Sequence, residues 1–329
     1  TLLCAAEKDY FPIDGARLTF AEAKNFYAGF GAANRIEMAE APEAHGWSEP
    51  LQKATVDWMR RWLLDDAKAG KQRQGDALPE ETLRCSPQGQ ALLLPGARSL
   101  YDLLSDKEKI LAKKRQKYWR SVVKREAIDE VRRIAGIRPI EDLPRANPDS
   151  LGKIECDGYV VERLVFKPEL GIYLPCLLAR PSKSSGKAWL ILHEKKEDML
   201  SDVFVLERLR EGDVVMLPDL RGVNETKRLD SAPEVKFLHE YIDSDWQDVT
   251  MAYMLGKSFV GMRTEDTLVL ARYLTQFDGI KEFKVNLAAY GILAPPALHA
   301  AALEPQLFES VRIERGLDSW ANTLQVPVS

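Results

Sequence analysis

Apolar runs and amphipathic stretches organise the first part of the chain. Apolar runs at residues 2–6 and 35–39 predict two short buried strands. Residues 19–29 begin with the spacing of a capping box and predict a helix between these strands. Apolar positions three and four residues apart over 51–63 predict an amphipathic helix. Residues 1–64 therefore have the order strand, helix, strand, loop, helix.

The last part of the chain has the same alternation over a longer stretch. Helical patterns lie between several runs of strand character, and most of these strands carry continuous apolar residues. Continuous apolar strands are typical of a sheet that is covered on both faces. The pattern predicts a three-layer α/β fold with a mostly parallel, doubly wound sheet. The expected strands are 159–167, 171–180, 188–193, 213–217, 284–290 and 311–315.

Between these two parts, the sequence is polar and then helical. Residues 65–100 read as a polar connection with a hairpin-like piece at 82–94. Residues 106–135 predict a long amphipathic helix rich in Lys and Arg. We expect its apolar stripe to pack on the α/β body, the stripe being Ile110, Trp119, Val122 and Ile128. The predicted domain boundaries are therefore 1–64, 65–150 with a helical linker, and 151–329.

Composition narrows the classes of partner. The chain has 329 residues, 45% of them hydrophobic and 29% charged, and a formal charge of −4. Such a balance does not favour nucleic acid, and the basic helix reads as a solvated face. No apolar run reaches the roughly 18 residues of a membrane span, so we expect no membrane partner. The N-terminus lacks the basic start of a signal peptide and reads as a mid-domain strand, which leaves the compartment open.

The four cysteines are widely spaced and form no CxxC pair. A disulfide framework or a zinc site is therefore not expected, and nothing in the sequence indicates another metal or a cofactor.

The turn after the strand at 284–290 has the layout of a nucleophile elbow. In the motif G-x-S-x-G, a strained strand-to-helix turn exposes a serine above the carboxyl ends of the strands. Gly291 fits the first glycine, but Leu293 stands at the expected serine position and Pro295 at the second glycine. Leucine has no nucleophilic atom. A tight turn of any doubly wound sheet is the alternative interpretation. Ser258 precedes a helix and follows no strand, so it does not replace the nucleophile.

Two loops carry candidate acid–base residues. His45 follows the second strand and is the best candidate general base, whereas Asp9 follows the first strand and could orient its imidazole. Asp14 is the rival acid, and a helix-capping or packing histidine is the alternative for His45.

His193 and Glu194 end the strand at 188–193, where a loop could supply an oxyanion-hole N–H. The carboxylate of Glu194 would disfavour an oxyanion there. The alternative for His193 is a histidine that only ends the strand.

Several motifs resemble acetyl-xylan-esterase-like α/β-hydrolases, relatives of the dienelactone-hydrolase and prolyl-oligopeptidase groups. Residues 9–16, 44–48 and the 58–62 helix are similar to the last third of that family. Residues 218–226 and 261–266, with the Leu293 elbow, are similar to its first two thirds. The resemblance implies that Asp9 and His45 are the triad acid and base, that Leu293 stands at the nucleophile position, and that the 193–195 loop borders the oxyanion hole.

The order of these motifs is unusual, because the acid and base come before the elbow. One interpretation joins the end of one hydrolase domain to the start of a second, as in tandem-domain esterases. The other is a circular permutant, in which strand 2–6 lies beside strand 311–315 and His45 faces Leu293. By resemblance, the function is hydrolysis of acylated carbohydrate or another small ester, with the remainder of a larger tandem-domain protein as a possible partner. The alternative is a non-catalytic pseudo-hydrolase that binds carbohydrate or scaffolds a partner domain.

Overall fold

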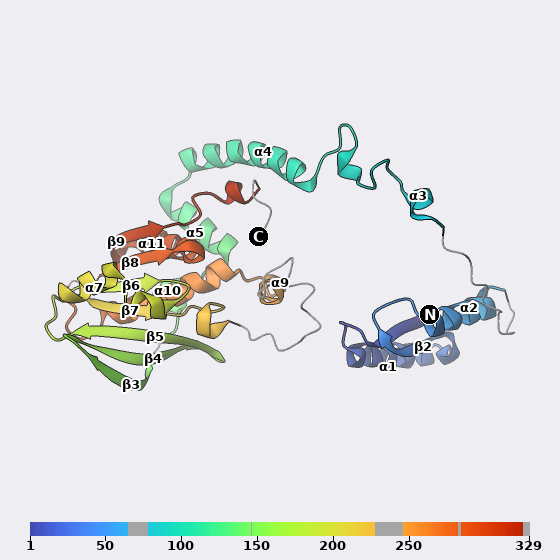
Figure 1. The fold of residues 1–329 in the computed structure, drawn as a ribbon, viewed down its shortest axis with the longest axis horizontal. Helices are drawn as coiled ribbons and strands as arrows, with labels where there is room; N and C mark the ends of the chain where they lie inside the picture. The colour runs from blue at the N-terminus through green and yellow to red at the C-terminus, as the bar shows by residue number, and fades with distance from the viewer. Residues whose placement is uncertain (65–77, 146, 228–245, 282–283, 325–329) are drawn as a thin grey trace. The chain divides into compact units, whose positions relative to one another are not determined.

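The computed structural model describes residues 1–64, 78–145, 147–227, 246–281 and 284–324. The described residues form two compact units, one of residues 1–97 and one that begins at Arg98. Within the described residues, no helix combines the length and apolar character that a membrane span requires. Figure 1 shows the helices and strands of each unit.

The first unit is a strand–helix–strand–helix arrangement, as the sequence predicts. Strand β1 (Leu2–Lys8) and strand β2 (Glu37–Ala44) pair in parallel and form a two-stranded sheet. Helix α1 (Ile13–Gly29) connects them, and helix α2 (Glu49–Leu63) follows β2. In this unit the residues of β1 pair with those of β2, and the expectation that strand 2–6 lies beside strand 311–315 stays a prediction.

The first unit buries little apolar surface. Helix α1 has 17 residues and none of them is buried, and α2 buries only Leu51 and Trp58. The apolar side chains of Phe26 and Phe30 on the α1 side are 67% and 74% exposed. An arrangement of this size with so small a core is of marginal stability alone. The buried apolar residues of this unit are Ala6, Ile36, Ala41, Leu51 and Trp58.

The remaining described elements of this unit are three short helical turns. They are η1 (Ala33–Arg35), α3 (Glu80–Leu83) and η2 (Ala91–Leu93). The hairpin predicted at 82–94 is therefore wrong: local helical hydrogen bonds replace strand pairing. Residues 65–77 of the predicted polar connection lie outside the described residues.

The second unit is built on a seven-stranded sheet of order β3-β4-β5-β7-β6-β8-β9. Strands β7, β6, β8 and β9 are parallel, as the continuous apolar runs predict. Strands β3, β4 and β5 add an antiparallel extension. The turn around Gly171 joins β4 to β5, and so short a turn can join only antiparallel strands. The strands are β3 (Asp149–Cys156), β4 (Tyr159–Glu169), β5 (Ile172–Pro181), β6 (Ala188–Leu192), β7 (Val214–Pro218), β8 (Val285–Tyr290) and β9 (Phe308–Glu314).

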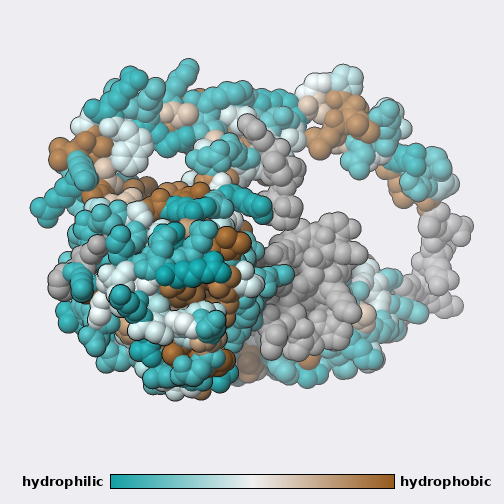
Figure 2. Space-filling model, turned by 60° about the vertical axis from the view of Figure 1, so that its left-hand side comes forward, coloured by the Kyte–Doolittle hydropathy of each residue, from teal (hydrophilic) through white to brown (hydrophobic). Residues whose placement is uncertain are grey.

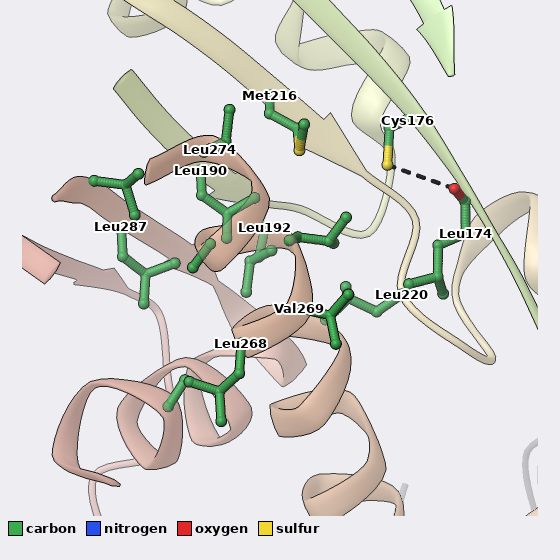
Figure 3. Packing of buried hydrophobic residues seen from close by; sticks show 14 of the residues in the cluster. Leu174, Cys176, Leu190, Leu192, Met216, Leu220, Leu268, Val269, Leu274 and Leu287 are labelled. Atoms are coloured by element: carbon green, nitrogen blue, oxygen red, sulfur yellow. Dashed lines mark hydrogen bonds between the residues drawn. The ribbon is translucent and has the colours of Figure 1, made fainter. Parts of the chain in front are cut away.

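Helices cover both faces of this sheet, which confirms the predicted three-layer α/β class. On one face, Leu190 and Leu287 of the strands pack with α10 (Phe259–Thr275) and α11 (Ala294–Leu303), as Figure 3 shows for part of the cluster. On the other face, Ile191 and Val215 pack with α7 (Val203–Arg210). Successive strand residues point to opposite faces, so neighbours such as Leu190 and Ile191 belong to different cores. Short helix α6 (Lys196–Met199) follows β6, and α9 (Trp246–Met254) precedes α10.

The predicted long helix is two helices, α4 (Leu100–Ser121) and α5 (Lys124–Ala135), with extended backbone at Val122 and Val123 between them. The predicted packing of its apolar stripe is wrong for α4, because Ile110 and Trp119 are 59% and 54% exposed and no residue of α4 is buried. Helix α4 contacts the helical turn η8 (Trp320–Leu324). On the face that Figure 2 displays, hydrophobic areas, drawn in brown, lie scattered among hydrophilic residues.

Helix α5 and the predicted linker after it are instead part of the second unit. Arg138 binds Glu265 of α10 through its guanidinium and through its backbone N–H, which is 2.8 Å from Oε1. Arg272 of α10 donates to the carbonyl oxygens of Ile140 and Leu143 at 2.7 and 3.0 Å. These charge-assisted bonds hold the segment before β3 against the helix layer.

Candidate active site

Asp9 and His45 lie at the same edge of the two-stranded sheet. Asp9 is the first residue after β1, and His45 is the first residue after β2. Because the strands are parallel, their carboxyl ends meet, and the Oδ2 atom of Asp9 lies 2.9 Å from Nδ1 of His45. This is the hydrogen bond by which a carboxylate fixes the tautomer and orientation of a catalytic imidazole.

The carboxylate of Asp9 is held at both oxygens. The backbone N–H of Phe11 donates to Oδ1 at 3.1 Å, while Oδ2 faces His45. The hydrogen bond with His45 is the main cause that lowers the pKa of Asp9. The rival acid, Asp14, lies in the first turn of α1 and pairs with Arg17 at 3.6 Å. The structure therefore brings Asp9, and not Asp14, to the imidazole.

The second nitrogen of His45 faces a residue that the sequence reasoning missed. The Oη atom of Tyr10 lies 3.3 Å from Nε2, and the two rings stack with centroids 4.5 Å apart. The only signal for Tyr10 in the sequence is its position next to Asp9. The His45 side chain is 56% exposed, whereas the Asp9 side chain is only 15% exposed.

In the second unit, strand order defines where a ligand crevice is expected. Strand β6 connects to β7 on one side, while its other neighbour is β8, so the order of strands reverses between β6 and β8. Ligands of open α/β sheets bind outside the carboxyl ends of the strands at such a switch point. His193 and Glu194 follow β6, and Gly291 follows β8. These residues form the rim at the switch point.

Leu293 does not lie on this rim. Its side chain is completely buried in the core formed with α10 and α11. The turn after β8 is a 3-10 turn, η6 (Gly291–Leu293), and Leu293 has ordinary helical backbone angles, φ −90° and ψ −4°. The expectation that Leu293 holds the exposed position of a nucleophile is therefore wrong.

His193 is satisfied by its own loop. Its Nδ1 atom lies 3.1 Å from the amide nitrogen and 3.0 Å from the carbonyl oxygen of Lys195, so either tautomer finds a partner. Its ring packs edge-on against Tyr290, with centroids 5.4 Å apart. When Nδ1 accepts from the Lys195 N–H, that amide is directed at the histidine ring and does not serve as an oxyanion donor.

A buried lysine lies beside this loop. The ammonium group of Lys196, which is 2% exposed, forms ion pairs with Asp219 and Glu225 and lies 3.2 Å from Glu197. Burial raises the pKa of Asp219, although Lys196 opposes this shift. The three carboxylates are close enough to hold a metal ion, but the lysine ammonium pairs with all three of them in this structure.

The two motifs of the second unit that carry the family resemblance meet at a buried ion pair. Arg221, from residues 218–226, donates Nε to Oδ2 of Asp266 at 2.8 Å and Nη2 to Oδ1 at 2.5 Å. Asp266 is completely buried, and it belongs to residues 261–266. Ser258 caps α10: its hydroxyl accepts from the Gly261 N–H at 2.9 Å and donates to Ala135 at 2.7 Å. These motif residues and Ser258 serve the structure of the unit.

Several solved structures that resemble this chain are acetyl xylan esterases and related esterases of the α/β-hydrolase type. A putative acetyl xylan esterase from Bacteroides fragilis is 15% identical with a TM-score of 0.46, covering 57% of this chain and 51% of its own. Acetyl xylan esterase 1 from Thermoanaerobacterium is 16% identical, with a TM-score of 0.38, and the match covers 56% of this chain and 57% of that chain. A glucuronoyl esterase from Solibacter usitatus is 12% identical with a TM-score of 0.38, covering 59% of this chain and 58% of its own.

These matches cover only part of each protein. The chain spans about half the length of the two acetyl xylan esterases described above. No protein-family model matches the chain, and no curated protein matches it.

Proposed function

We propose that residues 1–64 provide the acid and the base of a serine-esterase triad, and that the serine comes from polypeptide outside these 329 residues. Asp9 orients His45 and balances the imidazolium that forms, while Nε2 of His45 takes the proton of the serine hydroxyl. The hydrogen bond of 2.9 Å between Asp9 and His45 is the observation that carries the proposal.

The surroundings of this pair support an incomplete site. The His45 side chain is more than half exposed, and its Nε2 atom faces the hydroxyl of Tyr10. A serine hydroxyl that binds Nε2 would compete with the Tyr10 hydroxyl. The Tyr10 oxygen lies 3.3 Å from Nε2, which is longer than the 2.9 Å between His45 and Asp9. The small core of the unit also favours completion by further strands.

For the substrate, we propose an acylated carbohydrate or another small ester. The motifs around Asp9 and His45 resemble acetyl-xylan-esterase-like hydrolases, and the side chains of Tyr10, Phe11 and Trp47 near the pair are 58%, 66% and 57% exposed. Exposed aromatic rings offer flat apolar faces with a polar edge, which suits a ligand that is partly apolar and partly polar.

A fluorophosphonate probe on the full-length native polypeptide tests the proposal. We expect one labelled serine outside residues 1–329, with labelling that falls sharply in His45→Ala. The matched control is His299→Ala, since His299 lies on α11 and its Nδ1 contacts the Pro295 carbonyl oxygen at 2.7 Å. Labelling that is absent, or that is unchanged in His45→Ala, would overturn the proposal.

The alternative is a pseudo-hydrolase module that binds carbohydrate or scaffolds a partner domain. The observation that favours it is the rim of the second unit, where glycine follows β8 and the Glu194 carboxylate lies 2.8 Å from where a side chain at residue 291 would begin. Binding of xylo-oligosaccharides without ester turnover by the full-length protein would support this alternative.

A further inference from the structure

The turn after β8 has one strained backbone position, and it is Gly291. Its φ is +55°, in the left-handed region that side chains other than glycine rarely adopt. Leu293, two residues later, has ordinary helical angles and is fully buried. A nucleophile elbow places its serine on the strained residue of the turn, exposed at the carboxyl end of the strand. Gly291 is that residue here: it comes directly after β8 and is half-buried.

The space beside Gly291 is occupied by a carboxylate. A Cβ atom built on Gly291 would lie 2.8 Å from Oε1 of Glu194, closer than real Cβ atoms approach another heavy atom. Glu194 belongs to the loop after β6, across the switch point from β8, and it is exposed to solvent. Its flexible side chain can therefore move out of this space at small cost.

We propose that Gly291 stands at the nucleophile position of the second unit and that the Glu194 carboxylate fills the space of the missing nucleophile. The inference rests on interpreting residues 151–329 as a hydrolase unit, but it does not depend on His45. The unit then lacks acyl transfer for two reasons: no atom at residue 291 can attack, and the Glu194 carboxylate beside that residue would repel a developing oxyanion.

Cysteine accessibility tests which residue occupies the nucleophile position. In a Cys4→Ser/Cys85→Ser background, which removes the two exposed thiols, Gly291→Cys and Leu293→Cys are treated with iodoacetamide under native conditions and followed by intact mass. We expect Gly291→Cys to be alkylated in the native state and Leu293→Cys only after unfolding. Native alkylation of Leu293→Cys, with Gly291→Cys protected, would overturn the assignment.

A second comparison tests the role of Glu194. Adding Glu194→Ala to Gly291→Cys should raise the alkylation rate about tenfold, because a nearby carboxylate obstructs the thiol and disfavours its thiolate. The matched control is Glu207→Ala, since Glu207 is an exposed glutamate of α7. An unchanged rate with Glu194→Ala, or an equal gain with Glu207→Ala, would refute the filling role.

Strain at residue 291 could prevent the cysteine variant from folding, so stability gives an independent measure. Gly291→Ala should lower the midpoint of urea unfolding, and Glu194→Ala should recover part of that loss. In the wild-type background, Glu194→Ala should leave the midpoint nearly unchanged. Additive effects of the two substitutions would contradict the proposed contact. Neither readout uses esterase activity, so failure here is distinct from failure of the proposed Asp9–His45 triad.

Discussion

Asp9 and His45 are 36 residues apart in the chain, yet the carboxylate oxygen and the ring nitrogen lie 2.9 Å apart. Parallel pairing of β1 and β2 produces this contact, because it brings the residue after each strand to one edge. The contact joins an oriented imidazole to a carboxylate, and the second ring nitrogen faces the hydroxyl of Tyr10 at 3.3 Å.

Replacing Asp9 should abolish most of the activity of the full-length protein. Asp9→Asn removes the acceptor that fixes the His45 tautomer, and we expect a decrease of roughly 10⁴-fold in kcat, as in other triads. Initial rates of p-nitrophenyl acetate hydrolysis measure this effect. Asp14→Asn is the control, and it should leave kcat unchanged because Asp14 pairs with Arg17. A similar loss in both variants would contradict the assignment of Asp9.

The 329-residue chain by itself should not form an acyl-enzyme. The turn after β8 contains no serine, since residues 291–293 are Gly, Ile and Leu, so the wild-type chain should turn over p-nitrophenyl acetate no faster than the His45→Ala variant. Stopped-flow measurement of p-nitrophenol release checks this, and a burst from the wild-type chain would contradict it.

The protonation of Asp9 should report on its contact with His45. Its pKa is lowered from the usual 3.8, chiefly by the hydrogen bond with His45. A lowered carboxyl pKa means that the stabilising contribution is complete above about pH 3.8 and is lost as the pH falls through the folded-state value. The carboxyl carbon of Asp9 should therefore titrate below pH 3.8 by NMR. In His45→Ala its midpoint should move back up, and an unchanged midpoint would argue against the contact.

Removing the ammonium of Lys196 should destabilise the second unit strongly. Lys196→Met leaves Asp219, which is completely buried, without its cation, and we expect a loss of about 3–5 kcal/mol. Adding Asp219→Asn should restore part of this loss. Urea unfolding measures both effects, and Lys195→Met is the control at an exposed neighbour. If Lys196→Met left the free energy of unfolding unchanged, water would have to solvate Asp219.

Leu293 and Ile292 should differ sharply in their contribution to stability. Leu293→Ala removes a fully buried side chain and should cost about 2–5 kcal/mol in the free energy of unfolding. Ile292→Ala should cost much less, because Ile292 is 54% exposed. Equal costs in urea unfolding would mean that the turn after β8 is arranged differently.

The apolar side chains of α4 should be dispensable for stability. Trp119→Ser and Ile110→Ser replace side chains that are 54% and 59% exposed, and each should change the free energy of unfolding by less than about 0.5 kcal/mol. A large loss in either variant would show that α4 is covered in solution.

The sequence was informative wherever a pattern is local. Apolar runs identified the parallel strands, and the position of Asp9 and His45 directly after strands placed them at one edge. Predictions from pattern failed in short segments, where helix and strand signals are hard to distinguish. They also failed where burial of a helix face depends on whether another surface covers it. The piece at 82–94 was too short to distinguish a hairpin from helical turns. An amphipathic pattern in α4 did not reveal whether any surface covers it.

Residue chemistry and the succession of strands along the chain were thus set by the sequence itself, since apolar periodicity shows which residues follow which strand. The tertiary structure decided the rest. Spacing within G-x-S-x-G pointed to Leu293, but the backbone of the turn buries that side chain and leaves the strained position to Gly291. A spacing rule counts residues, whereas exposure and strain depend on how the 3-10 turn and the helix after it pack on the sheet. Likewise, only folding brings Glu194 from the loop after β6 to Gly291 after β8, because these loops are neighbours in the sheet and distant in the chain.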